Sequence, residues 1–322
     1  MSEIAHRRLG TSGLVVSTVG LGANNFGMRL DRKASAEVIH AAVDAGITLI
    51  DTSDSYSDSE DFLGEALEGK RDQVVLATKF GSALRDGRNG PDWGARGSRR
   101  YIRTAVESSL RRLRTDRIDL YQLHFPDAAT PMAETLAALT ELVHEGKVLY
   151  VGSSNLKPWQ VADAEWLARD LGLERFVSAQ NEYSLLDRRV EAELVPALEH
   201  YGIGLLPYFP LASGLLTGKY KRGEVAAEGT RVAAWGMQAA LTDAKFDVVE
   251  GLEAYAAERG ITLLDVAFGA LAAQPAVASV IAGATSPAQV QANVAAGVAA
   301  HHRGPRSPRR HRPVEAPRLS PV

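Results

Sequence analysis

Eight short runs of apolar and β-branched residues recur along the chain, and they constrain its fold more than any other feature. The runs are continuous rather than alternating, which is typical of parallel strands that are covered on both faces. Most of them begin about 26 to 30 residues apart, which leaves room for one strand, one helix and two short loops. They span residues 18–22, 47–51, 74–79, 118–124, 148–153, 177–180, 203–208 and 277–283.

Helical signals fill the stretches between these runs. Asp31 and Ser98 precede two of them as N-cap residues, and glycines end several others. Eight strand signals, each followed by a helical one, predict an α/β fold of the (β/α)8 TIM barrel type. A doubly wound sheet is the alternative, but the segment after the first run, Gly20 to Asn25, lacks the third glycine of a phosphate-binding fingerprint. The predicted helices are residues 33–45, 99–113, 132–145 and 192–200.

The predicted domain spans residues 1–297. Residues 7–9 and 14–16 flank Gly10-Thr11-Ser12-Gly13, which predicts an N-terminal β-hairpin that plugs the bottom of the barrel. The intervals 81–98 and 209–242 are long and follow strands, so we expect them to overhang the C-terminal face, where barrel enzymes carry their sites. Residues 298–322 are rich in Arg and Pro and are predicted to be disordered.

Composition excludes several functions. The chain has no cysteine, which removes disulfides, thiol nucleophiles and thiolate metal sites, and its histidines lack metal-ligand spacing, so no metal is expected. Its apolar runs are far shorter than the roughly 20 residues of a membrane span, and its N-terminus has no apolar signal region. We therefore expect a cytoplasmic protein. Residues 298–322 hold six arginines and one glutamate, which leaves the remainder with a net charge of −8 and argues against nucleic-acid binding.

Polar residues mark the C-terminal ends of three predicted strands. Asp51, Lys79 and His124 end the second, third and fourth runs, and Tyr56 follows Asp51 in the next loop. A lysine paired with an aspartate stays charged, and its charge favours the phenolate form of a nearby tyrosine, which lowers the pKa of that tyrosine. With a histidine to polarise a carbonyl oxygen, the group describes a general acid.

Each of these four residues also has an ordinary structural interpretation. Asp51 fits a helix cap, Lys79 a structural ion pair, His124 a core histidine and Tyr56 a surface aromatic. Their common placement at one rim of one barrel favours the functional interpretation.

The motifs IDTSDSYSDSEDFLGEAL, VVLATKFG, RIDLYQLHFPD, VGSSN, AQNEYSLLDR, LLPYFPLASGLLTGKY and VIAGATSPAQVQANV resemble the successive motifs of the aldo-keto reductase family. They occur in the family's order between residue 6 and about residue 297. The closer likeness is to the bacterial branch that resembles the potassium-channel β subunits.

The resemblance implies NAD(P)H-dependent reduction of an aldehyde or ketone to an alcohol. It makes Tyr56 the general acid, supported by Lys79 and Asp51, with His124 orienting the carbonyl. It places the nicotinamide carboxamide near Ser153, Ser154, Asn155 and Gln180, and the nicotinamide ring on Tyr208. The pyrophosphate loop corresponds to Phe209, Pro210, Leu211, Ala212, Leu215, Lys219 and Arg231, and the adenosine half to Gly283, Thr285, Gln289 and Asn293.

The expected partner is a small carbonyl compound. Phe26, Trp93 and Phe125 are the predicted pocket residues because they fall in rim loops, and Arg85, Arg88 and Arg96 leave room for an anionic substrate. Gly283, Ser286 and Gln289 are uncharged where many family members have basic residues, so a contact to a 2′-phosphate has to come from elsewhere, with Arg231 as the candidate. We expect NADPH as the cofactor, with NADH as the second candidate.

The C-terminus departs from the family, whose members continue into a further helix and a pocket loop. We interpret residues 298–322 as the product of a shifted reading frame or a replaced terminus, which the nucleotide sequence tests. Two other functions stay open at this point: a nucleotide-binding regulatory subunit with little turnover, and a barrel enzyme that uses Lys79 as a Schiff-base nucleophile.

Overall fold

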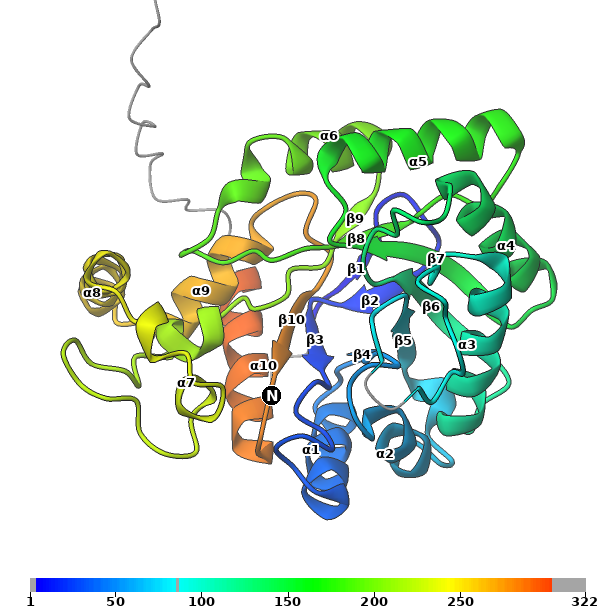
Figure 1. The fold of residues 1–322 in the computed structure, drawn as a ribbon. Helices are drawn as coiled ribbons and strands as arrows, with labels where there is room; N and C mark the ends of the chain where they lie inside the picture. Colours follow the sequence, from blue (N-terminus) through cyan, green and yellow to red (C-terminus); the bar gives the residue numbers. More distant parts are fainter. Residues whose placement is uncertain (1–3, 85–86, 303–322) are drawn as a thin grey trace, which may run out of the picture.

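Eight parallel strands form the barrel that the sequence predicts (Figure 1). The computed structural model of the chain describes residues 4–84 and 87–302. The strands follow one another around the sheet in the order β10-β3-β4-β5-β6-β7-β8-β9, and a parallel bridge between Leu205 and Val277 joins the two ends. They are β3 (Val19–Gly22), β4 (Leu49–Asp51), β5 (Val75–Phe80), β6 (Ile118–Leu123), β7 (Val148–Ser154), β8 (Ser178–Gln180), β9 (Gly204–Leu205) and β10 (Val280–Gly283).

Helices surround the strands, and their ends follow the predicted capping signals. Asp31 and Ser98 accept hydrogen bonds at the first turns of α1 and α3, and Gly202 ends α6 in the left-handed conformation at φ 69°. The main helices are α1 (Arg32–Asp44), α2 (Ser59–Ala66), α3 (Arg99–Arg112), α4 (Met132–His144), α5 (Pro158–Leu171), α6 (Leu194–Tyr201), α8 (Asp243–Glu258), α9 (Leu263–Ala272) and α10 (Pro287–His302). No described helix is both long and apolar enough to cross a membrane.

An N-terminal hairpin closes the bottom of the barrel, as predicted. Strands β1 (His6–Arg8) and β2 (Val15–Ser17) pair antiparallel, and the Thr11 amide between them donates to the Gly202 carbonyl at 2.8 Å. Leu9 and Val16 are fully buried in one apolar cluster with Leu49 of β4 and Leu206, which directly follows β9. A separate and larger cluster lies between the strands and the helices. The bottom is therefore packed, and access to the barrel is from the opposite face.

A long segment between β9 and α8 projects beyond α9 and α10 (yellow-green in Figure 1). It contains η3 (Ala212–Thr217), α7 (Arg231–Ala234) and η4 (Gln238–Ala240). Its buried residues Leu216 and Val232 pack with Phe246 of α8 and Ala267 of α9 in an apolar cluster of their own. Helix α10 continues to His302, and the rest of the predicted tail lies outside the described residues, so the division at residue 297 stays a prediction.

Candidate active site

The ends of three adjacent strands bring the predicted catalytic residues together. Asp51 is the last residue of β4, Lys79 is the next-to-last residue of β5, and His124 directly follows β6. Tyr56 lies in the loop after β4, and its ring stands edge-on to the His124 ring with 5.8 Å between centroids. The parallel register of the barrel therefore places all four side chains at the C-terminal rim.

A buried ion pair forms the floor of this group. The Lys79 ammonium donates to Asp51 Oδ2 at 2.6 Å and to the Thr52 carbonyl at 2.8 Å. Asp51 Oδ1 accepts from the Gln122 and Gln180 amides at 3.1 and 2.9 Å. Three donors thus compensate for the loss of water around one carboxylate, which makes a charged pair tolerable at this depth.

Lys79 keeps its charge despite full burial. Burial acts to lower the pKa of its ammonium, but Asp51 and Tyr56 outweigh that effect, so the pKa lies above its ordinary value. A protonated amine held by two acceptors is not a nucleophile, and this arrangement does not suit the Schiff-base function considered above.

The pKa of Tyr56 differs from the one expected from the charge of Lys79 alone. Burial raises the pKa of its phenol above the ordinary value, and the charge of Lys79, whose Nζ lies 5.0 Å from the ring centroid, acts in the opposite direction without prevailing. The net direction is therefore opposite to the predicted one, because loss of hydration outweighs one neighbouring charge. A phenol in this state keeps its proton at neutral pH and is able to donate it.

His124 is a neutral imidazole. Burial, together with the charge of Lys79, lowers the pKa of His124 to about 3. Its Nδ1 lies 3.1 Å from the Ser53 hydroxyl oxygen, and its ring stacks on Phe125 with 4.7 Å between centroids. The Nδ1 edge is thus engaged from behind, and the opposite edge, with Nε2, is left for the cavity that His124 lines.

A cavity of about 760 Å³ begins at these residues and extends over the C-terminal ends of the strands. This volume is in the range of small-molecule and cofactor sites. Seventeen of the predicted residues line it: Asp51, Tyr56, His124, Phe125, Ser154, Asn155, Gln180, Tyr208, Phe209, Pro210, Leu211, Lys219, Arg231, Gly283, Thr285, Gln289 and Asn293.

One wall of the cavity is held in place by Asn155. Its side-chain oxygen accepts from the Tyr208 hydroxyl at 2.8 Å, while its amide nitrogen donates to the His124 carbonyl at 2.9 Å. Asn155 achieves this with a left-handed backbone, φ 60°, and Phe209 next to Tyr208 has φ 50°. Asparagine tolerates this conformation, but an aromatic residue such as Phe209 adopts it only where the surroundings enforce it, and such strained residues cluster at functional sites. Asn155 thereby fixes the half-buried Tyr208 ring against the cavity.

A cation lies partly buried farther along the cavity. The Arg231 guanidinium donates to the side-chain oxygens of Asn24 and Asn25 at 3.0 and 3.2 Å, and it stacks over the rings of Phe209 and Trp235. Burial, with a contribution from the charge of Arg29, lowers the pKa of Arg231 to about 10. In the described part of the chain, the side chains that make these direct contacts with Arg231 are all uncharged. A partly buried cation of this kind fits an anionic ligand group such as a pyrophosphate.

The far end of the cavity is formed by the start of α10. Gln289 Oε1 accepts from the Thr285 amide and hydroxyl at 2.9 and 3.2 Å, which ties the segment before α10 to the first turn of the helix. The Ser286 hydroxyl caps the helix by accepting from the Gln289 amide at 3.3 Å. Gly283 is open to the cavity, and a Cβ there would lie 3.2 Å from the Asn25 amide nitrogen. The absence of a side chain keeps this passage clear for a ligand.

Besides Lys79, which lies beneath the cavity in its ion pair, five predicted residues do not line it. Ser153 and Leu215 are buried, and Ala212 lies at the start of η3 away from the cavity wall. Phe26 is fully buried in the core between strands and helices, whereas Trp93 is 71% exposed and stacks under Arg100. We therefore leave Phe26 and Trp93 out of the substrate site.

The loop arginines considered for an anionic substrate have other partners. Arg88 donates to the Ser57 carbonyl and pairs with Asp58, and Arg96 pairs with Asp92. Arg85 lies outside the described residues.

Several cavity residues were missed by the sequence analysis. Asn24, Asn25 and Arg29 follow β3, and Thr217 and Thr230 lie in the long segment after β9. Asn24 and Asn25 are polar residues just past the end of a strand. The rule that pointed to Asp51, a polar side chain at a strand end, therefore also points to these two asparagines. In the described part of the chain no three metal-ligating side chains come together, and the expectation of a metal-free site stays a prediction.

Comparison with known proteins agrees with the fold. Residues 18–301 match the aldo/keto reductase family. A probable voltage-gated potassium channel subunit beta from Oryza sativa subsp. japonica is 36% identical over 308 residues, which cover 90% of each chain. An uncharacterized oxidoreductase of Bacillus subtilis (strain 168) is 40% identical over 235 residues, 70% of this chain and 71% of its own. The L-glyceraldehyde 3-phosphate reductase of Escherichia coli (strain K12) is 32% identical over 309 residues, 91% of this chain and 88% of its own.

The (β/α)8 barrel with its cavity at the C-terminal rim, together with these relatives, places the chain among the oxidoreductases of this fold. The chain belongs to the aldo/keto reductase family.

Proposed function

We propose that this protein reduces a small aldehyde or ketone to an alcohol, with Tyr56 as the general acid and NADPH as the reductant. The observation that carries the proposal is the meeting of a protonated phenol, a charged lysine and a neutral imidazole at one end of the cavity. Tyr56 and His124 both line the cavity and lie beside each other, so their donor atoms are able to address one carbonyl oxygen.

The residues of the cavity fit a dinucleotide. Tyr208 offers an aromatic face, Gln180 keeps its carbonyl oxygen for an amide donor, and Arg231 and Lys219 supply positive charge for phosphates. A reduced nicotinamide, when bound, supplies the hydride for the carbonyl carbon. Tyr56 then donates its proton to the carbonyl oxygen, and Lys79 stabilises the phenolate that remains.

The preference for NADPH over NADH rests on charge. A cationic side chain at a 2′-phosphate adds a charge-assisted contact of about 1.5–3 kcal/mol. Residues at the start of α10 are neutral, but Arg231 and Arg29 both line the same cavity. NADH is the second candidate cofactor.

The substrate class follows from the near end of the cavity. Phe125 is 45% exposed and stacks on His124, so it offers an apolar face beside the proposed catalytic residues. Small aromatic and aliphatic carbonyl compounds fit such a face.

The decisive experiment measures oxidation of NADPH and NADH by the purified chain with 4-nitrobenzaldehyde, for wild type and Tyr56→Phe. We expect Tyr56→Phe to lower kcat by about 10²–10⁴-fold, the usual contribution of a positioned acid, with unchanged NADPH affinity. Tyr150→Phe is the matched control, because Tyr150 packs at the closed end of the barrel. Equal turnover of Tyr56→Phe and wild type contradicts the assignment.

Tight NADPH binding by wild type without turnover of any carbonyl compound supports a different function. The likeness to a potassium channel β subunit makes a nucleotide-sensing regulatory subunit the alternative in that case.

A further inference from the structure

A buried polar network lies behind His124, on the side away from the cavity. Ser53 and Asp54 continue β4 past Asp51, and the Asp54 amide donates to the Lys79 carbonyl at 3.1 Å, which holds this segment against β5. Ser53 and Asp54 are each 1% exposed. Neither lines the cavity, so a direct contact with substrate does not explain them.

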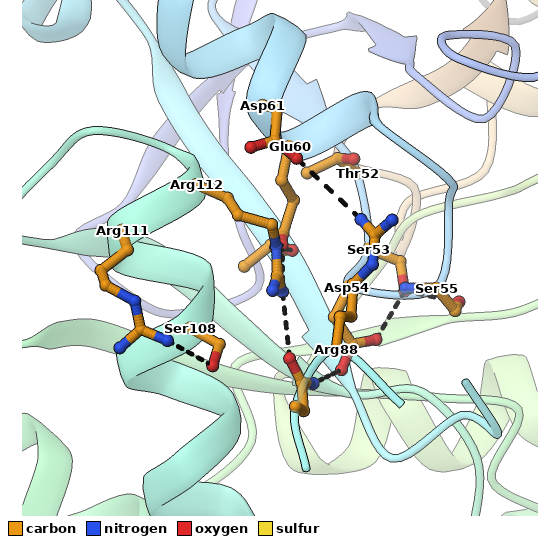
Figure 2. Close-up of polar contacts among 12 residues, drawn as sticks. Thr52, Ser53, Asp54, Ser55, Glu60, Asp61, Arg88, Ser108, Arg111 and Arg112 are labelled. Atoms are coloured by element: carbon orange, nitrogen blue, oxygen red, sulfur yellow. Dashed lines mark hydrogen bonds and ion pairs between the residues drawn. The ribbon is translucent and has the colours of Figure 1, made fainter. Parts of the chain in front are cut away.

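The network is continuous from an ion pair to the imidazole. Arg112 pairs with Glu60 at 2.7 Å and donates to Asn89 Oδ1 at 3.2 Å, and Asn89 Nδ2 donates to Asp54 Oδ2 at 2.7 Å. Asp54 Oδ1 lies 3.3 Å from the Ser53 hydroxyl, which in turn lies 3.1 Å from His124 Nδ1. Figure 2 shows the side chains from the Glu60–Arg112 pair through Asp54 to Ser53 and Ser55.

We propose that Ser53 and Asp54 are positioning residues that set the tautomer of His124, with the protonated form of Asp54 holding the imidazole proton on Nε2. This inference rests on the proposed function, since it gives His124 the N–H that a carbonyl oxygen needs. It also adds a pH-dependent switch to that function. When Asp54 loses its proton, the imidazole proton moves from Nε2 to Nδ1.

Ser53 Oγ also accepts from the Ser55 amide at 3.2 Å and lies 2.9 Å from Ser55 Oγ, so its single hydrogen has three acceptors within reach: Asp54 Oδ1, Ser55 Oγ and His124 Nδ1. In the proposal, the protonation state of Asp54 selects which of them receives it. Asp54 Oδ2 accepts from Asn89, so a proton on Asp54 sits on Oδ1 and is donated to the Ser53 oxygen. Ser53 then gives its own hydrogen to His124 Nδ1, and the neutral ring carries its single proton on Nε2. An ionised Asp54 instead accepts from Ser53, whose oxygen then accepts from Nδ1–H. The Asp54 proton leaves to solvent, and Nε2 is left without a hydrogen.

The surroundings of Asp54 place the loss of its proton, and with it the tautomer change of His124, near neutral pH. Burial and the charge of Glu60 raise the pKa of Asp54 to about 8, against the opposing charge of Arg112. Burial raises the pKa of Tyr101 to about 12 and that of Tyr121 well above its ordinary value, so neither phenol ionises in the same range. The ionisable groups that face Asp54 are Glu60 from α2, Tyr101 and Arg112 from α3, and Tyr121 and His124 from β6 and its end.

The first test reads the tautomer directly and needs no turnover. Protein labelled with ¹⁵N-histidine is followed by NMR between about pH 6 and about pH 9.5, a range that brackets the Asp54 pKa. The His124 signals among the eight histidines are identified by their loss in His124→Gln. Wild type is expected to change from Nε2–H to Nδ1–H around pH 8. A single tautomer throughout that range overturns the inference.

Variants separate the network from the fold. Asp54→Asn keeps an amide that donates to Ser53 and accepts from Asn89, so it is expected to keep Nε2–H at every pH. Asp61→Asn, on α2 but outside the network, is the matched control and should switch as wild type does. An Asp54→Asn protein that still switches overturns the proposal.

The kinetic arm tests the consequence for the proposed reaction. Above pH 8, kcat/KM of wild type should fall about tenfold per pH unit, as for loss of one required proton, while Asp54→Asn stays level. Ser53→Ala should lower kcat/KM about tenfold and lose the transition, with NADPH affinity unchanged. Ser108→Ala removes another buried hydroxyl on α3 and should match wild type. A tautomer switch in a protein without turnover supports this inference while contradicting the proposed function.

Discussion

The Lys79 ammonium lies 2.6 Å from Asp51 Oδ2, and the two side chains are only 0% and 4% exposed. Removing one partner of such a pair leaves an uncompensated charge in the interior. Lys79→Met should therefore lower the free energy of unfolding by about 3–5 kcal/mol, measured by urea denaturation. The double variant Lys79→Met/Asp51→Asn should lose less than the sum of the single variants, because no charge is then stranded.

Lys147 provides the control for this prediction. It pairs with Glu107 and Glu145 at the surface, where solvent screens the charges. Lys147→Met should cost less than about 1 kcal/mol. Equal losses for the two lysine variants contradict the view that burial makes the Lys79 pair different.

Asp54 predicts a pH dependence of stability. Its pKa is about 8 in the folded chain and about 3.9 in an unfolded one, so the folded state binds an additional proton between these values. Stability from this group is therefore lost as the pH rises through that window. Asp54→Asn should gain about 1.4 kcal/mol over wild type for each pH unit between about pH 5 and pH 7, and the gain should level off above pH 8. Parallel stability curves for the two proteins contradict the prediction.

The contacts of Tyr208 predict that its ring contributes more to nucleotide affinity than its hydroxyl does. Its hydroxyl contacts Asn155 rather than open solvent, and its ring lines the cavity. Tyr208→Phe keeps the stacking face and should change the Kd for NADPH less than threefold, about 0.6 kcal/mol. Tyr208→Ala removes the face and should weaken binding about tenfold, in line with the 1–3 kcal/mol of base–aromatic stacking. Fluorescence titration measures both, and equal losses contradict a stacking function.

The barrel and the four proposed catalytic residues were readable from the sequence because both depend on strand ends. Continuous apolar runs mark strands covered on both faces, and a polar residue at the end of such a run has to face the rim. Asp51, Lys79 and His124 follow this rule, and the structure brings them together with Tyr56. Their protonation states were less readable, because burial reverses the net pKa shift of Tyr56.

Loop residues were harder to place because their direction depends on tertiary contacts. Phe26 falls in a rim loop, but hydrogen bonds of the Ala23–Leu30 turn direct its ring into the core. Trp93, with φ 47°, turns outward onto Arg100. The Ser53–His124 contact joins β4 to β6 across β5, and no spacing along the chain indicates it. These placements follow from packing between elements and not from any local pattern.

At Gly64, one added methyl group should disturb the helix packing that holds the polar network behind His124. It lies in α2, and a Cβ there would stand 2.3 Å from the Arg112 carbonyl oxygen and 2.8 Å from the Leu113 carbonyl carbon. Backbone atoms do not move aside as a flexible side chain does, so Gly64→Ala has to push α2 away from the end of α3. Overpacking of this kind costs about 1–3 kcal/mol, and it should separate Glu60 from Arg112.

Gly251 is the matched control for this prediction, because it lies within α8 and a Cβ added there would meet no atom within 4 Å. Gly251→Ala should raise the free energy of unfolding by about 0.5–1 kcal/mol, the helix propensity difference between the two residues. Urea denaturation measures both changes in the free energy of unfolding. A decrease for Gly64→Ala with an increase for Gly251→Ala supports close contact between α2 and α3 as the cause of the loss. A stabilised Gly64→Ala protein contradicts it, since propensity alone would then decide both positions.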